Sequence, residues 1–171
     1  MNYEFGSIWR KWDLHFHTPS SFDYLNKSVT NQEIIDELSN NDISVIAITD
    51  HHTIDIARIK ELQQLGKEKN ITVLPGIELR SELGGSDSIH FIGIFPEDSN
   101  LEEVWMELQT KCKIKPSDIA EKGNENIYAD FKDTSNLVKS LGGLISVHAG
   151  SKKNTIENIT NTLSYKMAQK T

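Results

Sequence analysis

The histidines are the side chains of this chain that stand out for the chemistry they could do. His15 and His17 are two residues apart, and on a β-strand such a pair points to one face of the sheet, about 6.5 Å apart along the chain. Two imidazoles at this spacing can bind one metal ion. The pair alone equally fits two half-buried polar strand residues that bind nothing.

Other ionisable residues follow short apolar runs that are typical of strands. Asp50 and His51 end the run at residues 43–49, Glu78 ends the stretch ITVLPGIEL, and His148 ends the stretch LISVH. In α/β sheets and barrels, the carboxyl ends of the parallel strands form the face that carries the active site. We therefore expect these side chains to lie close together.

His90 precedes its apolar run, FIGIF, instead of following it. Only the segment RSELGGSDS separates this run from the strand of Glu78, and a segment this short favours a hairpin at Gly84-Gly85 over a covering helix. The hairpin would reverse the strand and place His90 beside Glu78. Imidazoles and carboxylates at apolar strand ends are costly when isolated and become mutually favourable around divalent cations, so the pattern predicts a metal site.

The stretches between these residues predict the elements that position them. Residues 12–17 and 43–49 are typical of central strands, and the segment TNQEIIDELSNND between them is typical of a helix. The helical segment IDIARIKELQQLGKEKN and the strand ITVLPGIEL repeat the pattern, which predicts an α/β sheet or barrel. We also predict helices at 100–112 and 131–141, a strand at 144–148 and a closing helix in the tail NTIENITNTLSYKMAQKT.

The composition is that of a single globular domain over residues 1–171. The formal net charge of −7 argues against a broad basic surface for nucleic acid, so bound metal would have to supply positive charge to such a substrate. Cys112 is the single cysteine, and no apolar run approaches the roughly 20 residues that cross a bilayer. We therefore expect a cytoplasmic protein with no membrane partner.

The stretches DLHFHT, ITDHH, PGIEL, HFIGIF and SVHAG resemble the successive motifs of the PHP (polymerase and histidinol phosphatase) family, over about residues 12–150. The resemblance implies a distorted (β/α)7-type barrel that binds two or three divalent metal ions, zinc, manganese or iron. The positions that match metal ligands of the family are His15, His17, His51, Glu78, His90 and His148.

Three residues near these motifs have alternative roles. Asp23, in the loop TPSSFDY, is either a further metal ligand or a plain aspartate of a loop turn. Asp50 is expected to orient His51 or to hydrogen-bond a loop backbone. His52 either reaches a substrate phosphate or lies in solvent, and we favour solvent. Glu78 is the expected bridging ligand, because one carboxylate offers two oxygens.

The sequence also departs from the family pattern. No Asp-x-His motif follows His148, and five strands are recognisable where the family has about seven, so the barrel is expected to lack its C-terminal part. A partner domain or a second chain could complete it. The opening GSIWRKWDLHFHTPSSFDY resembles PHP domains that precede a large ATPase module in bacterial proteins.

The resemblance implies a phosphoesterase that hydrolyses a phosphate ester with a metal-activated water, and Glu78, Asp50 and His52 are the candidate catalytic residues. The substrate could be a small phosphomonoester, a nucleotide or a nucleic-acid end. An alternative is a catalytically incomplete, metal-binding docking module of a larger ATPase-containing protein. A metal-dependent amidohydrolase also begins with His-x-His, but we find neither its bridging lysine nor its final aspartate.

The three tryptophans give no separate functional signal. Trp9, Trp12 and Trp105 lie near predicted strand or helix faces. In such positions tryptophan packs in a core more often than it stacks on bases, so we expect all three in the core.

Overall fold

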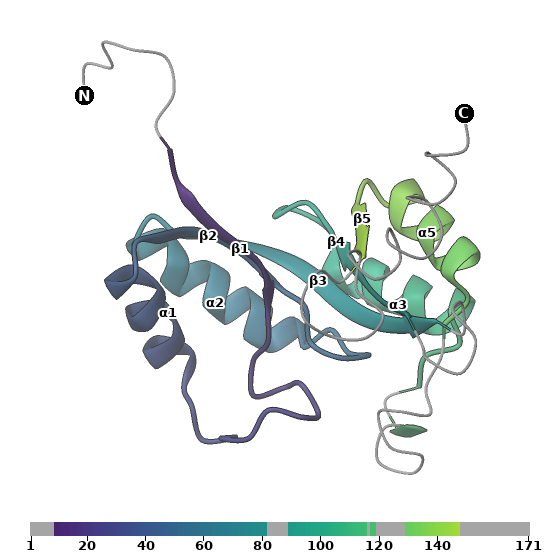
Figure 1. Cartoon of the computed structure of the whole chain (residues 1–171), viewed down its shortest axis with the longest axis horizontal. Helices are drawn as coiled ribbons and strands as arrows, with labels where there is room; N and C mark the ends of the chain where they lie inside the picture. Colours follow the sequence, from purple (N-terminus) through teal and green to yellow (C-terminus); the bar gives the residue numbers. More distant parts are fainter. Residues whose placement is uncertain (1–8, 82–88, 116, 119–128, 148–171) are drawn as a thin grey trace, which may run out of the picture.

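The structure, a computed structural model, describes residues 9–81, 89–115, 117–118 and 129–147. Within these ranges the chain forms one mixed sheet with helices beside it (Figure 1). The strands are β1 (Lys11–Phe16), β2 (Ile43–Ile48), β3 (Thr72–Ser81), β4 (Ile89–Ile94) and β5 (Leu144–Val147), and the helices are α1 (Asn31–Asn40), α2 (Ile56–Glu68), α3 (Leu101–Lys111) and α5 (Phe131–Ser140).

The five strands lie in the sheet in the order of the sequence, β1-β2-β3-β4-β5. The first three are parallel, whereas β4 runs antiparallel to both β3 and β5. Strand β3 joins the two halves, because its first residues pair with β2 and its residues from Gly76 onward pair with β4. The predicted α/β class and the antiparallel pair are confirmed, and the sheet curls as an incomplete barrel. The predicted turn at Gly84-Gly85 lies outside the described residues.

Helices α1 and α2 link the parallel strands, as the sequence predicts, and they pack on each other. Thr30 begins α1 with a capping box, in which its side chain accepts from the Glu33 backbone N–H and the Glu33 carboxylate accepts from the Thr30 N–H. Helices α3 and α5 lie beside the antiparallel half (Figure 1). None of the helices in the described ranges is long and apolar enough to span a membrane.

The two faces of the sheet have different surroundings. On β3 and β4, Leu79 pairs with Phe91, and both are fully buried in the core, where the Phe91 ring meets Phe131 of α5 edge-on at 5.1 Å between centroids. Glu78 and His90 lie on the other face, because side chains of a strand alternate between faces. The candidate site is therefore on the face that points away from the helices.

The predicted burial of all three tryptophans is wrong for two of them. Trp12 pairs with Val45 on the face opposite the core residue Ile46, and its side chain is 59% exposed. Trp9 precedes β1 and is 97% exposed, whereas Trp105 of α3 packs partly buried against the core as predicted. The helices of the described ranges cover one face of the sheet, and alternation puts Trp12 on the other.

Candidate metal centre

The carboxylate of Glu78 lies at the centre of a group of histidines. Its side chain is 1% exposed. Oxygen Oε2 lies 2.7 Å from His15 Nε2, 3.1 Å from His17 Nε2 and 3.7 Å from His51 Nδ1. Oxygen Oε1 lies 2.6 Å from His90 Nδ1. Five residues that the sequence singled out, from four separate segments, thus meet around one buried carboxylate.

The sheet brings these segments together by backbone hydrogen bonds that continue beyond β2. The N–H of Glu78 donates to the carbonyl oxygen of Asp50 (3.1 Å), and the N–H of His52 donates to the carbonyl oxygen of Glu78 (2.9 Å). His51 and Glu78 form a parallel bridge between these bonds. The residues after β2 therefore continue the parallel pairing with β3, which places His51 beside Glu78.

Asp50 fastens the loop after β1. Its Oδ1 accepts from the backbone N–H of Thr18 at 2.6 Å, and its Oδ2 accepts from the Thr18 hydroxyl at 2.7 Å. The expectation that Asp50 hydrogen-bonds a loop backbone is confirmed. Burial raises the pKa of Asp50 to about 6, although the two bonds from Thr18 act in the opposite direction.

Ser21 links the loop to the histidines, and no sequence pattern indicated it. Its hydroxyl donates to Asp23 Oδ1 (2.8 Å) and accepts from the backbone N–H of His51 (3.2 Å). The same oxygen lies 3.2 Å from His17 Nδ1. Ser21 is fully buried, so one hydroxyl fixes the positions of three candidate ligands at once.

Lys27 holds the same loop from its other end. Its ammonium group donates to the carbonyl oxygens of Pro19, Ser21 and Phe22. The three hydrogen bonds hold the Lys27 ammonium group against the loop backbone.

Asp23 reaches the cluster from this loop. Its Oδ2 lies 3.2 Å from His51 Nε2, although 55% of its side chain is exposed. Burial raises the pKa of Asp23, but the hydrogen bond from Ser21 and the nearby His51 outweigh it, so the pKa is lowered. Of the two roles left open by the sequence, this contact favours the metal ligand.

His52 does not lie in solvent, and that prediction is wrong. It is fully buried, because its backbone turns into the left-handed region (φ 54°) while its N–H stays bonded to β3. Neither ring nitrogen has a hydrogen-bond partner among the described residues. Burial, reinforced by His51 and Arg80, lowers the pKa of His52 to about 3.

Burial and hydrogen bonds shift the pKa values of the cluster residues in different directions. Burial lowers the pKa of His51 to about 4. Burial acts the same way on His17, but its hydrogen bond with Glu78 prevails and raises its pKa. Burial alone would raise the pKa of Glu78, yet the hydrogen bonds from His15, His17 and His90 hold it well below its usual range. Glu78 is therefore an anion at neutral pH.

The donor set fits divalent metal ions. Three overlapping groups have ligand atoms within 4.8 Å of one another, and they are His15, His17 and Glu78; His17, Asp23 and His51; and His51, Glu78 and His90. The buried Nδ1 of His51 has no hydrogen-bond partner in the described part of the chain. Nitrogen and carboxylate oxygen donors of this kind suit zinc, manganese and iron. His148, the remaining predicted ligand, lies outside the described residues.

Arg80 is a second residue near the centre that sequence reasoning missed. It pairs with His90 across β3 and β4, and its Nε donates to His90 Nε2 at 3.0 Å. The sequence predicted that the strand ends at Glu78, but β3 continues to Ser81, and the contact of Arg80 depends on the register of β4 in this extension.

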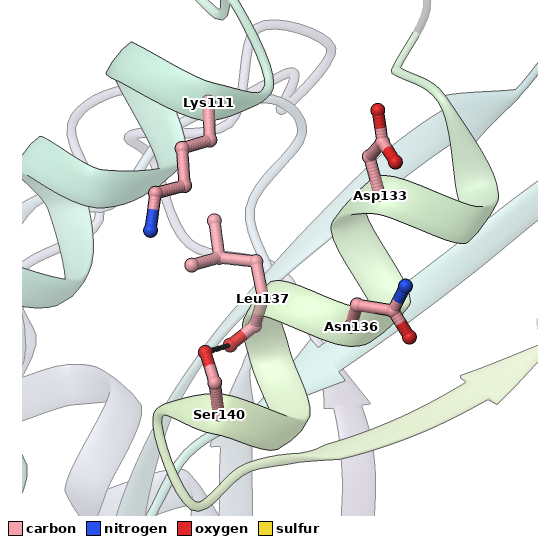
Figure 2. Close-up of a pocket in the computed structure, with 5 residues that line it drawn as sticks. All are labelled: Lys111, Asp133, Asn136, Leu137 and Ser140. Atoms are coloured by element: carbon pink, nitrogen blue, oxygen red, sulfur yellow. Dashed lines mark hydrogen bonds between the residues drawn. The ribbon is translucent and has the colours of Figure 1, made fainter.

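A separate pocket of about 490 Å³ lies between α3 and α5 (Figure 2). Its lining residues are Lys111, Asp133, Asn136, Leu137 and Ser140. The Ser140 hydroxyl is used within α5, where it donates to the Leu137 carbonyl oxygen at 2.7 Å. No lining residue belongs to the histidine cluster, so the two features are independent.

Comparisons of sequence find no relative: no family model matches the chain, and no curated protein does. Solved structures do match. An amidohydrolase from Chromobacterium violaceum, described with bound sulfate and no metal, aligns with a TM-score of 0.57 and 15% identity over 94% of this chain and 74% of its own. A candidate metal-dependent phosphoesterase from Bifidobacterium adolescentis aligns with a TM-score of 0.56 and 15% identity, over 91% and 74%.

A third structure is a two-domain protein from Bacteroides vulgatus, described as containing a predicted PHP-like metal-dependent phosphoesterase. It aligns with a TM-score of 0.50 and 22% identity, over 80% of this chain and 34% of its own. Identities this low bear on the fold and not on the reaction. The chain has the fold of the PHP-like metal-dependent phosphoesterases.

Proposed function

We propose that the protein is a metal-dependent phosphoesterase, which hydrolyses a phosphate ester. The observation that carries the proposal is the buried carboxylate of Glu78, with imidazole nitrogens of four histidines within 3.7 Å of its two oxygens. Without a cation, the Nε2 atoms of His15 and His17, 3.0 Å apart, crowd the same oxygen of Glu78, and the buried Nδ1 of His51 has no hydrogen-bond partner among the described residues. A divalent ion turns the same donors into ligands.

The proposed ligands form two or three adjoining sites for zinc, manganese or iron. Glu78 would be a ligand common to more than one ion, because its Oε2 faces His15, His17 and His51 whereas its Oε1 faces His90. When bound, such ions supply Lewis acidity to a phosphoryl group and make hydroxide available near neutral pH. The further proposed ligands are Asp23 and the predicted His148.

The chain's own residues then orient and protect the centre. Asp50 holds the loop after β1 through Thr18, and that loop carries His17 and Asp23. His51 and His52 stay uncharged at neutral pH because burial lowers their pKa values. We propose that His52 hydrogen-bonds a water or a substrate, because neither of its buried ring nitrogens has a partner among the described residues.

Two other functions, an amidohydrolase and a docking module, can be distinguished from a phosphoesterase by measurement. An amidohydrolase shares the fold, so the fold does not separate amide from phosphate ester as the substrate. A docking module of a larger protein would explain why Trp12 and Leu144, 59% and 73% exposed, are uncovered. Activity on a phosphate ester, together with a filled multinuclear site, favours the phosphoesterase over both.

The proposal is tested with Glu78→Gln, assayed on p-nitrophenyl phosphate with Mn²⁺ or Zn²⁺ and analysed for metal content. We expect loss of bound metal and at least about a 100-fold fall in kcat/KM, because the amide removes the central anion. Glu102→Gln is the matched control, since Glu102 is a surface glutamate that pairs with Lys60. Undiminished hydrolysis by Glu78→Gln, or by protein stripped with a chelator, would contradict the proposal.

A further inference from the structure

The hydroxyl of Ser21 contacts three polar groups of the candidate metal centre. Its oxygen lies 2.8 Å from Asp23 Oδ1, 3.2 Å from the backbone nitrogen of His51 and 3.2 Å from His17 Nδ1. Ser21 is fully buried, so bulk water does not compete for these contacts. A serine hydroxyl has one proton to donate and two lone pairs that accept, so the three contacts use its whole hydrogen-bonding capacity.

The direction of each hydrogen bond follows from the groups at its two ends. The backbone N–H of His51 can only donate, so the Ser21 oxygen accepts there. The exposed carboxylate of Asp23 is ionised at neutral pH and can only accept, so it receives the hydroxyl proton. Ser21 then has no proton left for His17. The third contact is a hydrogen bond only if His17 Nδ1 carries a proton and donates it to the Ser21 oxygen.

The opposite assignment would leave two acceptors facing each other. If the hydroxyl donated its proton to His17 Nδ1, a lone pair of Ser21 would face Asp23 Oδ1 at 2.8 Å with no proton between the two oxygens. Ser21 is buried, and a buried acceptor without a donor costs free energy. The geometry therefore favours the assignment in which all three contacts of Ser21 are hydrogen bonds.

The other ring nitrogen of His17 lies on the side of the central carboxylate. Its Nε2 is 3.1 Å from Glu78 Oε2 and 3.0 Å from His15 Nε2. A neutral imidazole has a proton on one nitrogen and a lone pair on the other, and only the lone pair binds a metal ion. A proton on Nδ1 places the lone pair on Nε2. In the other tautomer Nε2 would carry the proton, and His17 could not bind an ion beside Glu78.

We propose that Asp23 and Ser21 are positioning residues that fix the tautomer of His17 for metal binding. The Asp23 carboxylate takes the hydroxyl proton of Ser21, the Ser21 oxygen takes the Nδ1 proton of His17, and Nε2 keeps its lone pair. The hydrogen bond at one ring nitrogen of a histidine generally sets which nitrogen binds the metal. This inference rests on the metal centre of the proposed function and names residues that prepare it.

The two oxygens of Asp23 are compatible with a second role as a ligand. Oδ1 accepts from Ser21, whereas Oδ2 lies 3.2 Å from His51 Nε2. Asp23 can therefore hold the hydroxyl proton with one oxygen and offer the other oxygen to an ion beside His51. The N–H of His51 also donates to Ser21, so the loop after β1 and the residues after β2 meet at one buried hydroxyl.

The test reads the tautomer of His17 in metal-free protein by long-range proton–nitrogen NMR spectra, at a mildly alkaline pH at which imidazoles are neutral. The signals of His17 are assigned by their loss in His17→Gln. Wild type is compared with Ser21→Ala, Ser21→Thr and Asp23→Ala. The matched control is Thr134→Val, which removes another buried hydroxyl, one that contacts Cys112. Competition with a chelating dye measures the Zn²⁺ affinity of the same proteins.

We expect His17 of the wild type to carry its proton on Nδ1. Ser21→Ala should populate the tautomer with the proton on Nε2, because Nδ1 has lost its acceptor whereas Nε2 still lies beside Glu78. Asp23→Ala should do the same through Ser21, because the hydroxyl proton is then free to turn toward Nδ1. Asp23 is exposed, so this variant keeps the test open if Ser21→Ala does not fold.

The Zn²⁺ affinity should follow the tautomer. We expect Ser21→Ala to bind Zn²⁺ about 10- to 100-fold more weakly than wild type, the usual effect of removing the hydrogen-bond partner of a metal-binding histidine. Ser21→Thr keeps the hydroxyl and should restore the wild-type tautomer. Thr134→Val should match wild type in tautomer and in Zn²⁺ affinity.

The outcomes separate this inference from the proposed function. A proton on Nε2 of His17 in wild type, or an unchanged tautomer in Ser21→Ala or Asp23→Ala, would overturn the inference. Weaker Zn²⁺ binding by Ser21→Ala with an unchanged tautomer would also overturn it, since Ser21 would then act only by holding Asp23. The tautomer is measured without metal or substrate. Wild-type protein that has the expected tautomer but hydrolyses no phosphate ester would overturn the phosphoesterase function and uphold the role of Ser21.

Discussion

Burial decides which histidines of the cluster are charged. His51 and His52 are almost fully buried, and burial lowers their pKa values to about 4 and about 3. Both rings are therefore neutral at pH 7 and have a lone pair to offer. Because a metal ligand must be unprotonated, the fold prepares His51 for a cation before any cation binds.

The same shifts predict how the metal-free protein responds to acid. A histidine whose folded pKa is depressed stabilises the protein fully above its unfolded pKa of about 6.5, and this stability is lost as the pH falls toward the folded value. For His52, with a folded pKa of about 3, the loss should reach about 2 kcal/mol at pH 5. Asp50 works in the opposite direction, since its pKa is raised to about 6.

A variant isolates the contribution of His52 from that of its neighbours. His52→Asn removes the titrating ring, and asparagine tolerates the left-handed backbone at this position. In urea unfolding with a chelator present, the free energy of unfolding of wild type should fall by about 2 kcal/mol more than that of His52→Asn between pH 7.5 and pH 5. Equal pH dependence in the two proteins would show that His52 is not held neutral by the fold.

At the scale of elements, β3 brings the site together by changing partners. Gly76 lies where pairing passes from β2 to β4, and a Cβ there would sit 2.8 Å from the Gly93 carbonyl oxygen and 2.9 Å from that of Ile48. Both close neighbours are backbone atoms that cannot move without the strands. Gly76 thus permits the close approach of β2 and β4 just before Glu78.

Gly76→Ala should therefore destabilise the protein by about 2 kcal/mol or more, because overpacking against backbone forces strands apart. Denaturant unfolding measures this loss, and metal content should fall with it as Glu78 shifts. Gly142→Asn is the control: among the described residues its Cβ would meet only Pro96, at 3.8 Å, and asparagine adopts a φ of 77° at less cost than most residues. A Gly76→Ala protein as stable as the control would refute the close-approach argument.

Elements with a regular pattern were the ones that the sequence could predict. The apolar runs and the short link before His90 predicted the antiparallel reversal that puts His90 beside Glu78. The loop after β1 has no periodicity, so the parts played by Thr18 and Ser21 could not be read from it. An apolar pattern also does not indicate which face of a strand the helices cover. For this reason Trp12 was wrongly predicted to lie in the core.

At the scale of the molecule, helices cover one face of the described sheet, and the other face carries both the centre and exposed apolar side chains. Leu144 of β5 and Trp12 of β1 mark the two edges of the described sheet, at 73% and 59% exposure. The expectation that a partner domain or chain completes the barrel stays a prediction. The closing helix predicted for the tail lies outside the described residues.

The centre also links parts of the chain that are far apart in sequence. β1 and the loop after it, the residues after β2, and the β3–β4 pair each supply candidate ligands, and each must be in place for all of them to meet at Glu78. An ion bound there would bind the folded chain and not the unfolded one. Its binding free energy is then added to the stability of the whole fold.

We therefore expect Mn²⁺ or Zn²⁺ at 100 times its Kd to raise the free energy of unfolding by about 2.7 kcal/mol over chelated protein at pH 7.5. Acid should reduce the gain, because protons compete with metal for the imidazoles and for Asp23. Glu78→Gln should show no such gain, whereas the surface variant Glu102→Gln should show it in full. Equal unfolding curves for wild type with metal and with chelator would mean that these segments meet without holding an ion, and the cluster would then be only a network of hydrogen bonds.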